Sequence, residues 1–126
     1  MKFINLSDKP TSQWEEEQVI AARRMAGCEV LLDIMLPSIP PKMDEAALAQ
    51  LVNQHVECIH GIAKPGDAIV HLMGGPEAIG FIYQMVARLR RDNYIVVHST
   101  TRMVEVFERR VPQFVRFREY REGDLI

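Results

Sequence analysis

The chain has 126 residues, the size of one ordinary domain, and 48% of them are apolar, which is enough for a core and excludes a disordered chain. The net charge of −2 and the pI near 6.1 argue against general affinity for long nucleic acid. No apolar stretch is long enough to span a membrane, and the N-terminus lacks a signal-peptide pattern. Cys28 and Cys58 lack metal-ligand spacing, so we expect reduced thiols, a cytoplasmic location and no membrane association.

Charge is distributed unevenly along the chain. Residues 1–80 hold six basic and eleven acidic side chains, whereas residues 81–126 hold nine arginines, no lysine and six acidic side chains. An arginine-rich C-terminal third favours an anionic ligand, because guanidinium groups pair well with phosphate and carboxylate oxygens. We expect most of these arginines, taken singly, to face solvent.

Strands and helices are predicted to alternate through the first 100 residues. The strands are expected over 2–7, 29–36, 68–73 and 94–99, and the helices over 13–26, over 45–62 and from Pro76 to a break at 92–93. Ser12 and Glu15 form a capping-box pattern, and Asp44 is expected to cap the second helix. The apolar faces predicted for the three helices comprise Trp14, Gln18, Ala21, Ala22 and Met25; Leu48, Leu51, Val52, Val56, Ile59 and Ile62; and Ile79, Ile82, Val86 and Leu89.

The C-terminal segment has a different pattern. Residues 102–111 and 114–120 alternate apolar and charged side chains, which predicts half-exposed antiparallel strands near a sheet edge, with Phe114 and Phe117 on opposite faces. The whole chain is therefore expected to be one α/β domain over 1–126, with a Rossmann-like, mostly parallel sheet flanked by helices and a C-terminal antiparallel β-hairpin.

Open parallel sheets bind ligands beyond the carboxyl ends of their strands, and this rule selects three predicted loops. They cover residues 6–12, 73–80 and 98–102. Gly74 and Gly75 allow close approach of a backbone, and the helix after Pro76 directs free amide groups at the crevice, which suits a phosphate. The glycine segment matches no established dinucleotide or P-loop motif, so the prediction depends on the three loops together.

Hydroxyl and charged side chains in these loops are the candidate site residues. We assign catalysis to Arg102, Ser7 and Thr101, and ligand binding to Asp8, Lys9, Thr11, Gly74, Gly75, Glu77, Ser99 and Thr100. Glu77 either accepts hydrogen bonds from a ribose or base, or simply complements the helix dipole. His71 is interpreted as a satisfied core residue, and no metal site is expected among the four scattered histidines.

Four segments together resemble a known family. The stretches FINLS, PGDAIVHLMGG, IVVHSTTR and FVRFREY resemble small standalone CRISPR-associated ring nucleases of the CARF class (CRISPR-associated Rossmann fold). The resemblance implies a CARF-type domain that binds a cyclic oligoadenylate as a homodimer and cleaves the ring. By position it implies that the site is lined by Ser7, Gly74, Gly75, Thr100, Thr101 and Arg102.

The chemistry of such a ring is compatible with these residues. Each ribose 2′-hydroxyl lies beside a phosphate, so cleavage requires geometry and charge stabilisation, with neither a cofactor nor a metal. Arg102 is expected to stabilise the developing charge, with Lys9 as an alternative cation. Three other readings stay open: a module that binds the ring without cutting it, a nucleotide-cofactor enzyme on a Rossmann-like sheet, and a structural subunit in which residues 98–102 form only a polar turn.

Overall fold

The computed structural model describes residues 1–28 and 30–121 and has the predicted α/β architecture. The strands are β1 (Lys2–Ser7), β2 (Leu31–Met35), β3 (Ala68–Met73), β4 (Ile95–Val106) and β5 (Arg109–Glu119). The helices are α1 (Glu16–Ala26), α2 (Glu45–Ile62) and α3 (Ile79–Arg91), preceded by short 3₁₀ turns at Thr11–Gln13 and Pro76–Ala78. The start predicted for the second strand includes residue 29, which lies outside the described residues.

All five strands form one sheet in the order β2-β1-β3-β4-β5. The first four run parallel, and β5 pairs antiparallel with β4, which confirms a mostly parallel sheet with a C-terminal hairpin. From β1 the chain first moves outward to β2 and then returns to the other side of β1 as β3. The strand order therefore reverses between β1 and β3, and in doubly wound sheets such a reversal opens a crevice at the carboxyl ends of the two strands.

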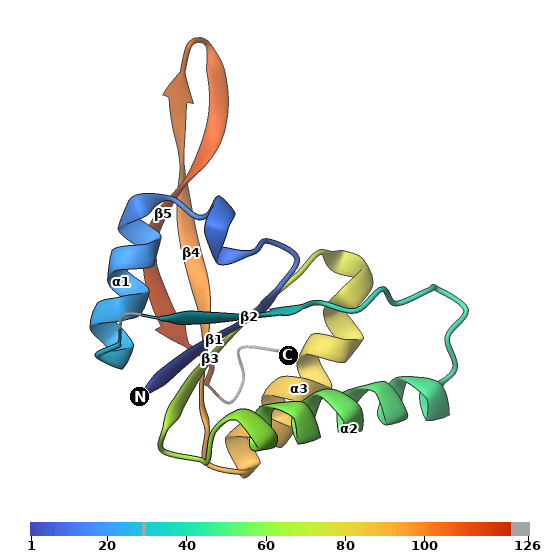
Figure 1. Cartoon of the computed structure of the whole chain (residues 1–126). Coiled ribbons are helices and arrows are strands. Elements are labelled where there is room, and N and C mark those ends of the chain that lie inside the picture. The colour runs from blue at the N-terminus through green and yellow to red at the C-terminus, as the bar shows by residue number, and fades with distance from the viewer. Residues whose placement is uncertain (29, 122–126) are drawn as a thin grey trace.

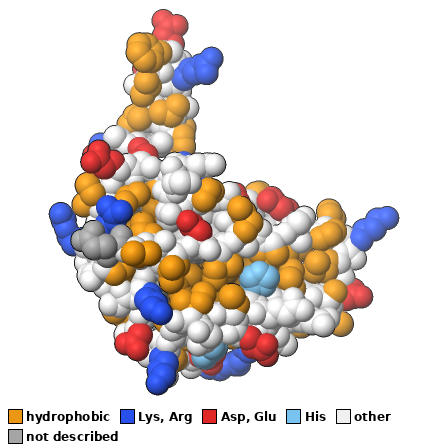
Figure 2. Space-filling view, viewed as in Figure 1, with side chains coloured by type: hydrophobic (Ala, Val, Ile, Leu, Met, Phe, Trp, Pro, Cys, Tyr) orange, Lys and Arg blue, Asp and Glu red, His pale blue; other side chains and the backbone are white. Residues whose placement is uncertain are grey.

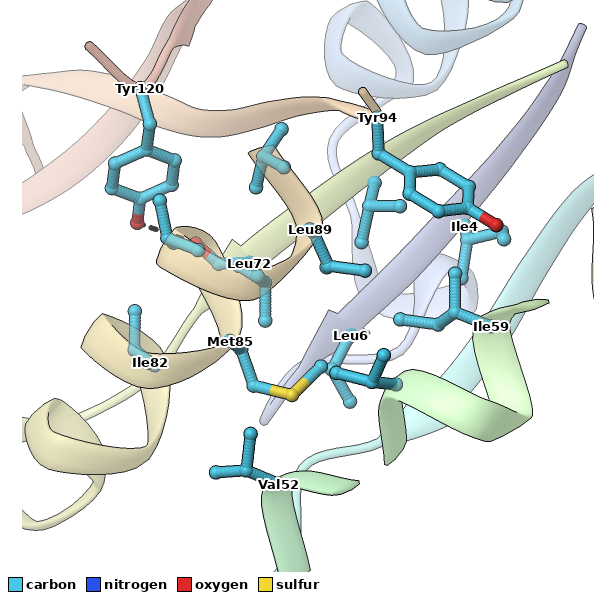
Figure 3. Close-up of a cluster of buried hydrophobic side chains, with 14 of the residues drawn as sticks. Ile4, Leu6, Val52, Ile59, Leu72, Ile82, Met85, Leu89, Tyr94 and Tyr120 are labelled. Atoms are coloured by element: carbon cyan, nitrogen blue, oxygen red, sulfur yellow. Dashed lines mark hydrogen bonds between the residues drawn. The ribbon is translucent and has the colours of Figure 1, made fainter. Parts of the chain in front are cut away.

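Helices cover both faces of the sheet (Figure 1). Helix α1 packs on one face against an aromatic cluster that includes Phe3, Trp14 and Phe117, while α2 and α3 pack on the other face. The larger core lies under α2 and α3 and contains Leu72 and Met85 (Figure 3). There the hydroxyl of Tyr120, just after β5, donates to the Leu72 carbonyl at 2.8 Å and ties the end of the hairpin to β3.

Helix α2 has the predicted bounds and the predicted cap, because the Asp44 carboxylate accepts from the Ala47 amide at 2.8 Å. The predicted capping box of the first helix is wrong. Residues 11–13 form a 3₁₀ turn, α1 begins only at Glu16, and the Glu15 carboxylate accepts from the Phe114 amide of β5 at 2.6 Å. Met25 was expected to face inward but is 43% exposed, because the buried face of α1 follows Gln18, Ala22 and Ala26.

The inward face of α3 differs from the prediction at its first turn. Residues 76–78 form the 3₁₀ turn, so α3 begins only at Ile79, whose side chain is 54% exposed although it was expected to face inward. Phe81 and Met85 are buried instead, together with the predicted Ile82, Val86 and Leu89. The pattern therefore identified the buried face from Ile82 onward, but it placed the start of that face too early and omitted Phe81 and Met85.

Strand β4 is longer than predicted, and this corrects the expected loop at residues 98–102. The strand continues without interruption from Ile95 to Val106, so the segment HSTTR is extended backbone. Beyond the sheet, β4 and β5 form a two-stranded arm that projects from the body (Figure 1). The arm turns at Phe107 and Glu108, both of which have positive φ angles (50° and 64°), inside the segment 102–111 that was expected to be one strand.

A β-bulge changes the faces of β5. The pairing shifts between Thr100, opposite Arg116, and Thr101, opposite Phe114, which leaves Val115 as an extra residue in β5. Phe114 and Phe117 therefore both face α1 and are buried, contrary to the strict alternation expected from the sequence. The Phe114 amide, next to the bulge, donates to the Glu15 carboxylate.

Two further sequence expectations can be compared with the fold. Cys28 and Cys58 are free thiols, as predicted. Within the described residues, no helix combines the length and the apolar character needed to cross a membrane.

Candidate functional site

A small cavity of about 160 Å³ lies on the α1 face of the sheet, at the carboxyl ends of β1 and β3 and beside the part of β4 that follows its pairing with β3. This is the side of the strand-order reversal at which the crevice was expected. Trp14 and Gln18 near the start of α1 form its far wall. The strands β1, β3 and β4 and the turn after β1 contribute Ser7, Asp8, Lys9, Met73, Ser99 and Thr101.

The end of β1 is held in a tight turn. The Ser7 hydroxyl donates to the Lys9 carbonyl at 2.9 Å and accepts from the Lys9 amide at 3.2 Å. The Trp14 indole N–H donates to the same carbonyl at 3.1 Å. The Asn5 side-chain amide donates to this carbonyl as well, at 2.9 Å, so four bonds fix the backbone of Lys9, whereas the side chains of Asp8 and Lys9 are exposed.

Asp33 of β2 connects the loop after β1 to the sheet. Its carboxylate accepts from the Thr11 amide at 3.0 Å, from the Thr11 hydroxyl at 2.8 Å and from the Asn5 side-chain amide at 2.9 Å. Thr11, predicted to bind ligand, is therefore bonded to β2 and does not line the cavity.

His71 lies at the floor of the cavity and is 2% exposed. Its ring lies among Phe3, Trp14 and Phe117, with centroid distances of 6.3, 5.1 and 5.4 Å. Burial, with a smaller contribution from the charge of His98, lowers the pKa of His71 from 6.5 to about 3. The imidazole is therefore neutral at physiological pH, and both its nitrogens are bonded to side chains, Nδ1 to Asn5 at 2.9 Å and Nε2 to Ser99 at 3.2 Å.

The hydroxyl residues of β4 divide between the two faces of the strand. Ser99 and Thr101 line the cavity. Thr100 and Arg102 point the other way, because neighbouring side chains in a strand alternate. The Thr100 hydroxyl donates to the Arg116 carbonyl at 3.0 Å, and the exposed Arg102 donates through Nε to the Gln113 side chain at 3.0 Å.

The predicted glycine loop borders a different cavity, of about 310 Å³. Gly74 and Gly75 lie there beside Ile82, Tyr83 and Tyr120, in a setting that is mainly apolar. Glu77 folds back over Gly75, so that a methyl group built on Gly75 would meet its carboxylate oxygens at 2.6 and 2.7 Å. The three loops selected from the sequence therefore do not form one pocket, because the glycine loop borders this second cavity.

Gly74 has a packing role that a substitution can measure. A Cβ at this position would lie 2.6 Å from Leu36 Cδ2 and 3.2 Å from Ile82 Cδ1, so Gly74→Ala is expected to lower the free energy of unfolding by about 1–3 kcal/mol. Gly75→Ala is the matched control: its backbone angles are open to any residue, and only the exposed Glu77 side chain must move. Urea unfolding of both variants checks this, and equal stabilities would contradict the packing role.

The largest cavity, about 720 Å³, lies along the outer edge of β5. Three arginines border it, Arg116, Arg118 and Arg121, together with His98, whose ring stacks on Tyr120 at 4.7 Å. It shares no lining residue with the cavity of about 160 Å³ on the α1 face. Over residues 1–28 and 30–121, no group of three histidine, cysteine or acidic side chains has the spacing of a metal site.

Three polar residues of the site, Asn5, Asp33 and His71, were absent from the sequence assignment or interpreted as core. Each is a polar side chain inside a strand that is otherwise apolar, and Asn5 stands in register with both Asp33 and His71. That shared position was the available signal, but it becomes visible only once the strand order is known.

The MJ1673 family, described as a family of uncharacterized proteins, has a model that matches residues 1–118. Neither the curated proteins nor the solved structures contain a match to this chain.

Proposed function

Because the chain belongs to the uncharacterized MJ1673 family, whose description assigns no activity, we propose a function from the site itself: the protein is a CARF-type ring nuclease that binds and cleaves a cyclic oligoadenylate. One observation carries the proposal. The cavity at the reversal of strand order combines two hydroxyl side chains of β4, Ser99 and Thr101, with the end of β1 and its exposed lysine.

Lys9 is the cation best placed for a phosphate in this cavity. Its backbone is fixed by Ser7 and Trp14, its side chain is exposed, and within the described ranges it forms no ion pair. Arg102 faces away from the cavity in the same chain, so Lys9 takes the charge-stabilising role in the proposal. Asp8 and Glu15 also border the cavity, and Glu15 is already bonded to the Phe114 amide.

The size of the cavity supports a homodimer. A volume of about 160 Å³ is smaller than the roughly 300–1,000 Å³ typical of ligand pockets. One chain therefore encloses only part of a nucleotide, and a ring needs the same site repeated by two-fold symmetry. Met35, Ile79 and Tyr83 are exposed apolar side chains at the same carboxyl edge, 66%, 54% and 39% accessible, and they offer a surface for the second copy.

The proposed reaction uses the ring's own nucleophile. The ribose 2′-oxygen attacks the adjacent phosphorus, the bond from phosphorus to the 5′-oxygen breaks, and a 2′,3′-cyclic phosphate forms. The 2′-hydroxyl proton passes to water and the leaving 5′-oxygen takes a proton from water, so the step needs no cofactor. Lys9 stabilises the charge on the phosphoryl oxygens, and the protein holds the attacking and leaving oxygens in line.

Chromatography of purified protein incubated with cyclic tetra-adenylate or cyclic hexa-adenylate in EDTA tests the proposal. We expect loss of one ring and appearance of linear products ending in a 2′,3′-cyclic phosphate. Tight binding with an intact ring would identify a binding module instead. Absence of binding to either ring would refute the function altogether, and copurified dinucleotide would favour a cofactor enzyme.

A further inference from the structure

A chain of side-chain hydrogen bonds crosses four neighbouring strands beneath the cavity. Asp33 of β2 accepts from Asn5 of β1, Asn5 contacts His71 of β3, and His71 contacts Ser99 of β4. The three distances are 2.9, 2.9 and 3.2 Å, and Asn5 and His71 are both nearly inaccessible to solvent. Ser99 and the His71 ring border the cavity, whereas Asn5 and Asp33 do not line it.

The direction of each bond follows from the chemistry of the partners. The Asn5 side-chain nitrogen donates to two groups that only accept, the Asp33 carboxylate and the Lys9 carbonyl at 2.9 Å. The Asn5 oxygen is therefore the atom that faces His71, and His71 must carry its proton on Nδ1. The buried imidazole is neutral, so its Nε2 has a lone pair and accepts from the Ser99 hydroxyl.

This direction decides what Ser99 offers to a ligand. A serine hydroxyl has one proton and two lone pairs, and the proton of Ser99 is committed to His71. Ser99 therefore presents only acceptor lone pairs to the cavity. A phosphate oxygen, which also only accepts, is a poor partner for it, whereas a hydroxyl group is a good one. Ser7 cannot supply the missing donor, because its proton is committed to the Lys9 carbonyl.

We infer that Ser99 is a fixed hydrogen-bond acceptor that recognises a ribose 2′-hydroxyl, and that the Asp33–Asn5–His71 chain sets its direction. This inference rests on the proposed function and names the ligand group that Ser99 contacts. It also narrows the ligand-binding role expected for Ser99 to that of an acceptor for a hydroxyl group. Ser99 positions the hydroxyl without removing its proton, because an imidazole as hard to protonate as that of His71 is a weak base.

Binding of cyclic tetra-adenylate and of its all-2′-deoxy analogue, measured by calorimetry, tests the inference. We expect the wild type to bind the ribose ring about tenfold more tightly, the effect of one hydrogen bond, and Ser99→Ala to lose that preference. Thr101→Val is the matched control, since Thr101 lines the same cavity from the same strand but lies outside the hydrogen-bond chain. Thr101→Val should keep the preference.

The outcomes separate this inference from the proposed function. Equal binding of the two rings by the wild type, or an unchanged preference in Ser99→Ala, refutes the role of Ser99 while the ring remains a ligand. Failure of both rings to bind refutes the proposed function and the inference with it. Nitrogen NMR of the His71 ring gives a readout without ligand: a proton on Nδ1 is expected, and a proton on Nε2 would overturn the direction of the chain.

Discussion

Lys9→Ala is expected to slow cleavage of the cyclic oligoadenylate by about 100-fold, the cost of removing one group that stabilises developing charge. Lys9 lines the cavity at the end of β1, and its backbone is held by bonds to Ser7 and Trp14. Lys9→Arg keeps the charge and should restore much of the rate. Single-turnover measurement of ring cleavage, with the protein in excess, checks both variants.

Arg102→Ala is the matched control for the loss of a cation. Arg102 lies on the opposite face of β4, exposed and bonded to Gln113, so its removal is expected to change the rate by less than about threefold. A large loss in Arg102→Ala together with a small loss in Lys9→Ala would show that the guanidinium acts at the phosphate. The arm of one protomer would then have to reach the cavity of the other.

The stability of the protein is expected to fall as the pH is lowered from 6.5 towards 3, because His71 titrates differently in the folded and unfolded states. Burial lowers the pKa of His71 to about 3 in the fold, against 6.5 in the unfolded chain, so the unfolded state binds the proton first. The contribution of the neutral His71 to the free energy of unfolding is complete above pH 6.5 and is lost as the pH falls from 6.5 towards 3. Between pH 7.5 and pH 5 this one residue should remove on the order of 2 kcal/mol.

Urea unfolding at pH 7.5 and pH 5 measures the effect, with His71→Gln as the comparison. The variant is expected to be less stable at pH 7.5 but to lose much less stability on going to pH 5. His98 is the charged side chain that acts directly on His71, and the Asp33 carboxylate is connected to His71 through the hydrogen bonds of Asn5. Asp8, Lys9 and Glu15 border the same cavity, so the interval stops at pH 5, above the range in which carboxylates usually titrate. The same loss in the wild type and the variant would rule out His71 as the source.

Local patterns were enough to predict most of the fold. The alternation of strands and helices gave the parallel sheet, and the cap at Asp44 placed helix α2 correctly. The errors occurred where a tertiary contact outweighs a local preference. Glu15 has the spacing of a capping box, but its carboxylate accepts from the Phe114 amide of β5, next to the bulge.

The candidate site was predictable only in part, for a related reason. The rule for carboxyl ends of strands correctly selected Ser7, Asp8, Lys9, Ser99 and Thr101 as neighbours around one cavity. It could not anticipate that residues 98–102 remain in a strand, which sends Thr100 and Arg102 to the other face. Nor does a sequence show the direction of a hydrogen bond. That direction is the reason why Ser99 accepts a hydrogen bond from a hydroxyl group and does not donate one to a phosphate oxygen.

The arm carries exposed apolar side chains among charged ones, with Phe107 at its tip 95% accessible (Figure 2). Its two strands are joined by cross-strand pairs from Arg102 and Gln113 outward to Val106 and Arg109. Removing one residue from either strand would exchange the faces of everything beyond it, whereas removing an opposed pair leaves the register intact. The arm can therefore become longer or shorter by whole cross-strand residue pairs, while the residues that line the cavity at the base of the arm keep their positions.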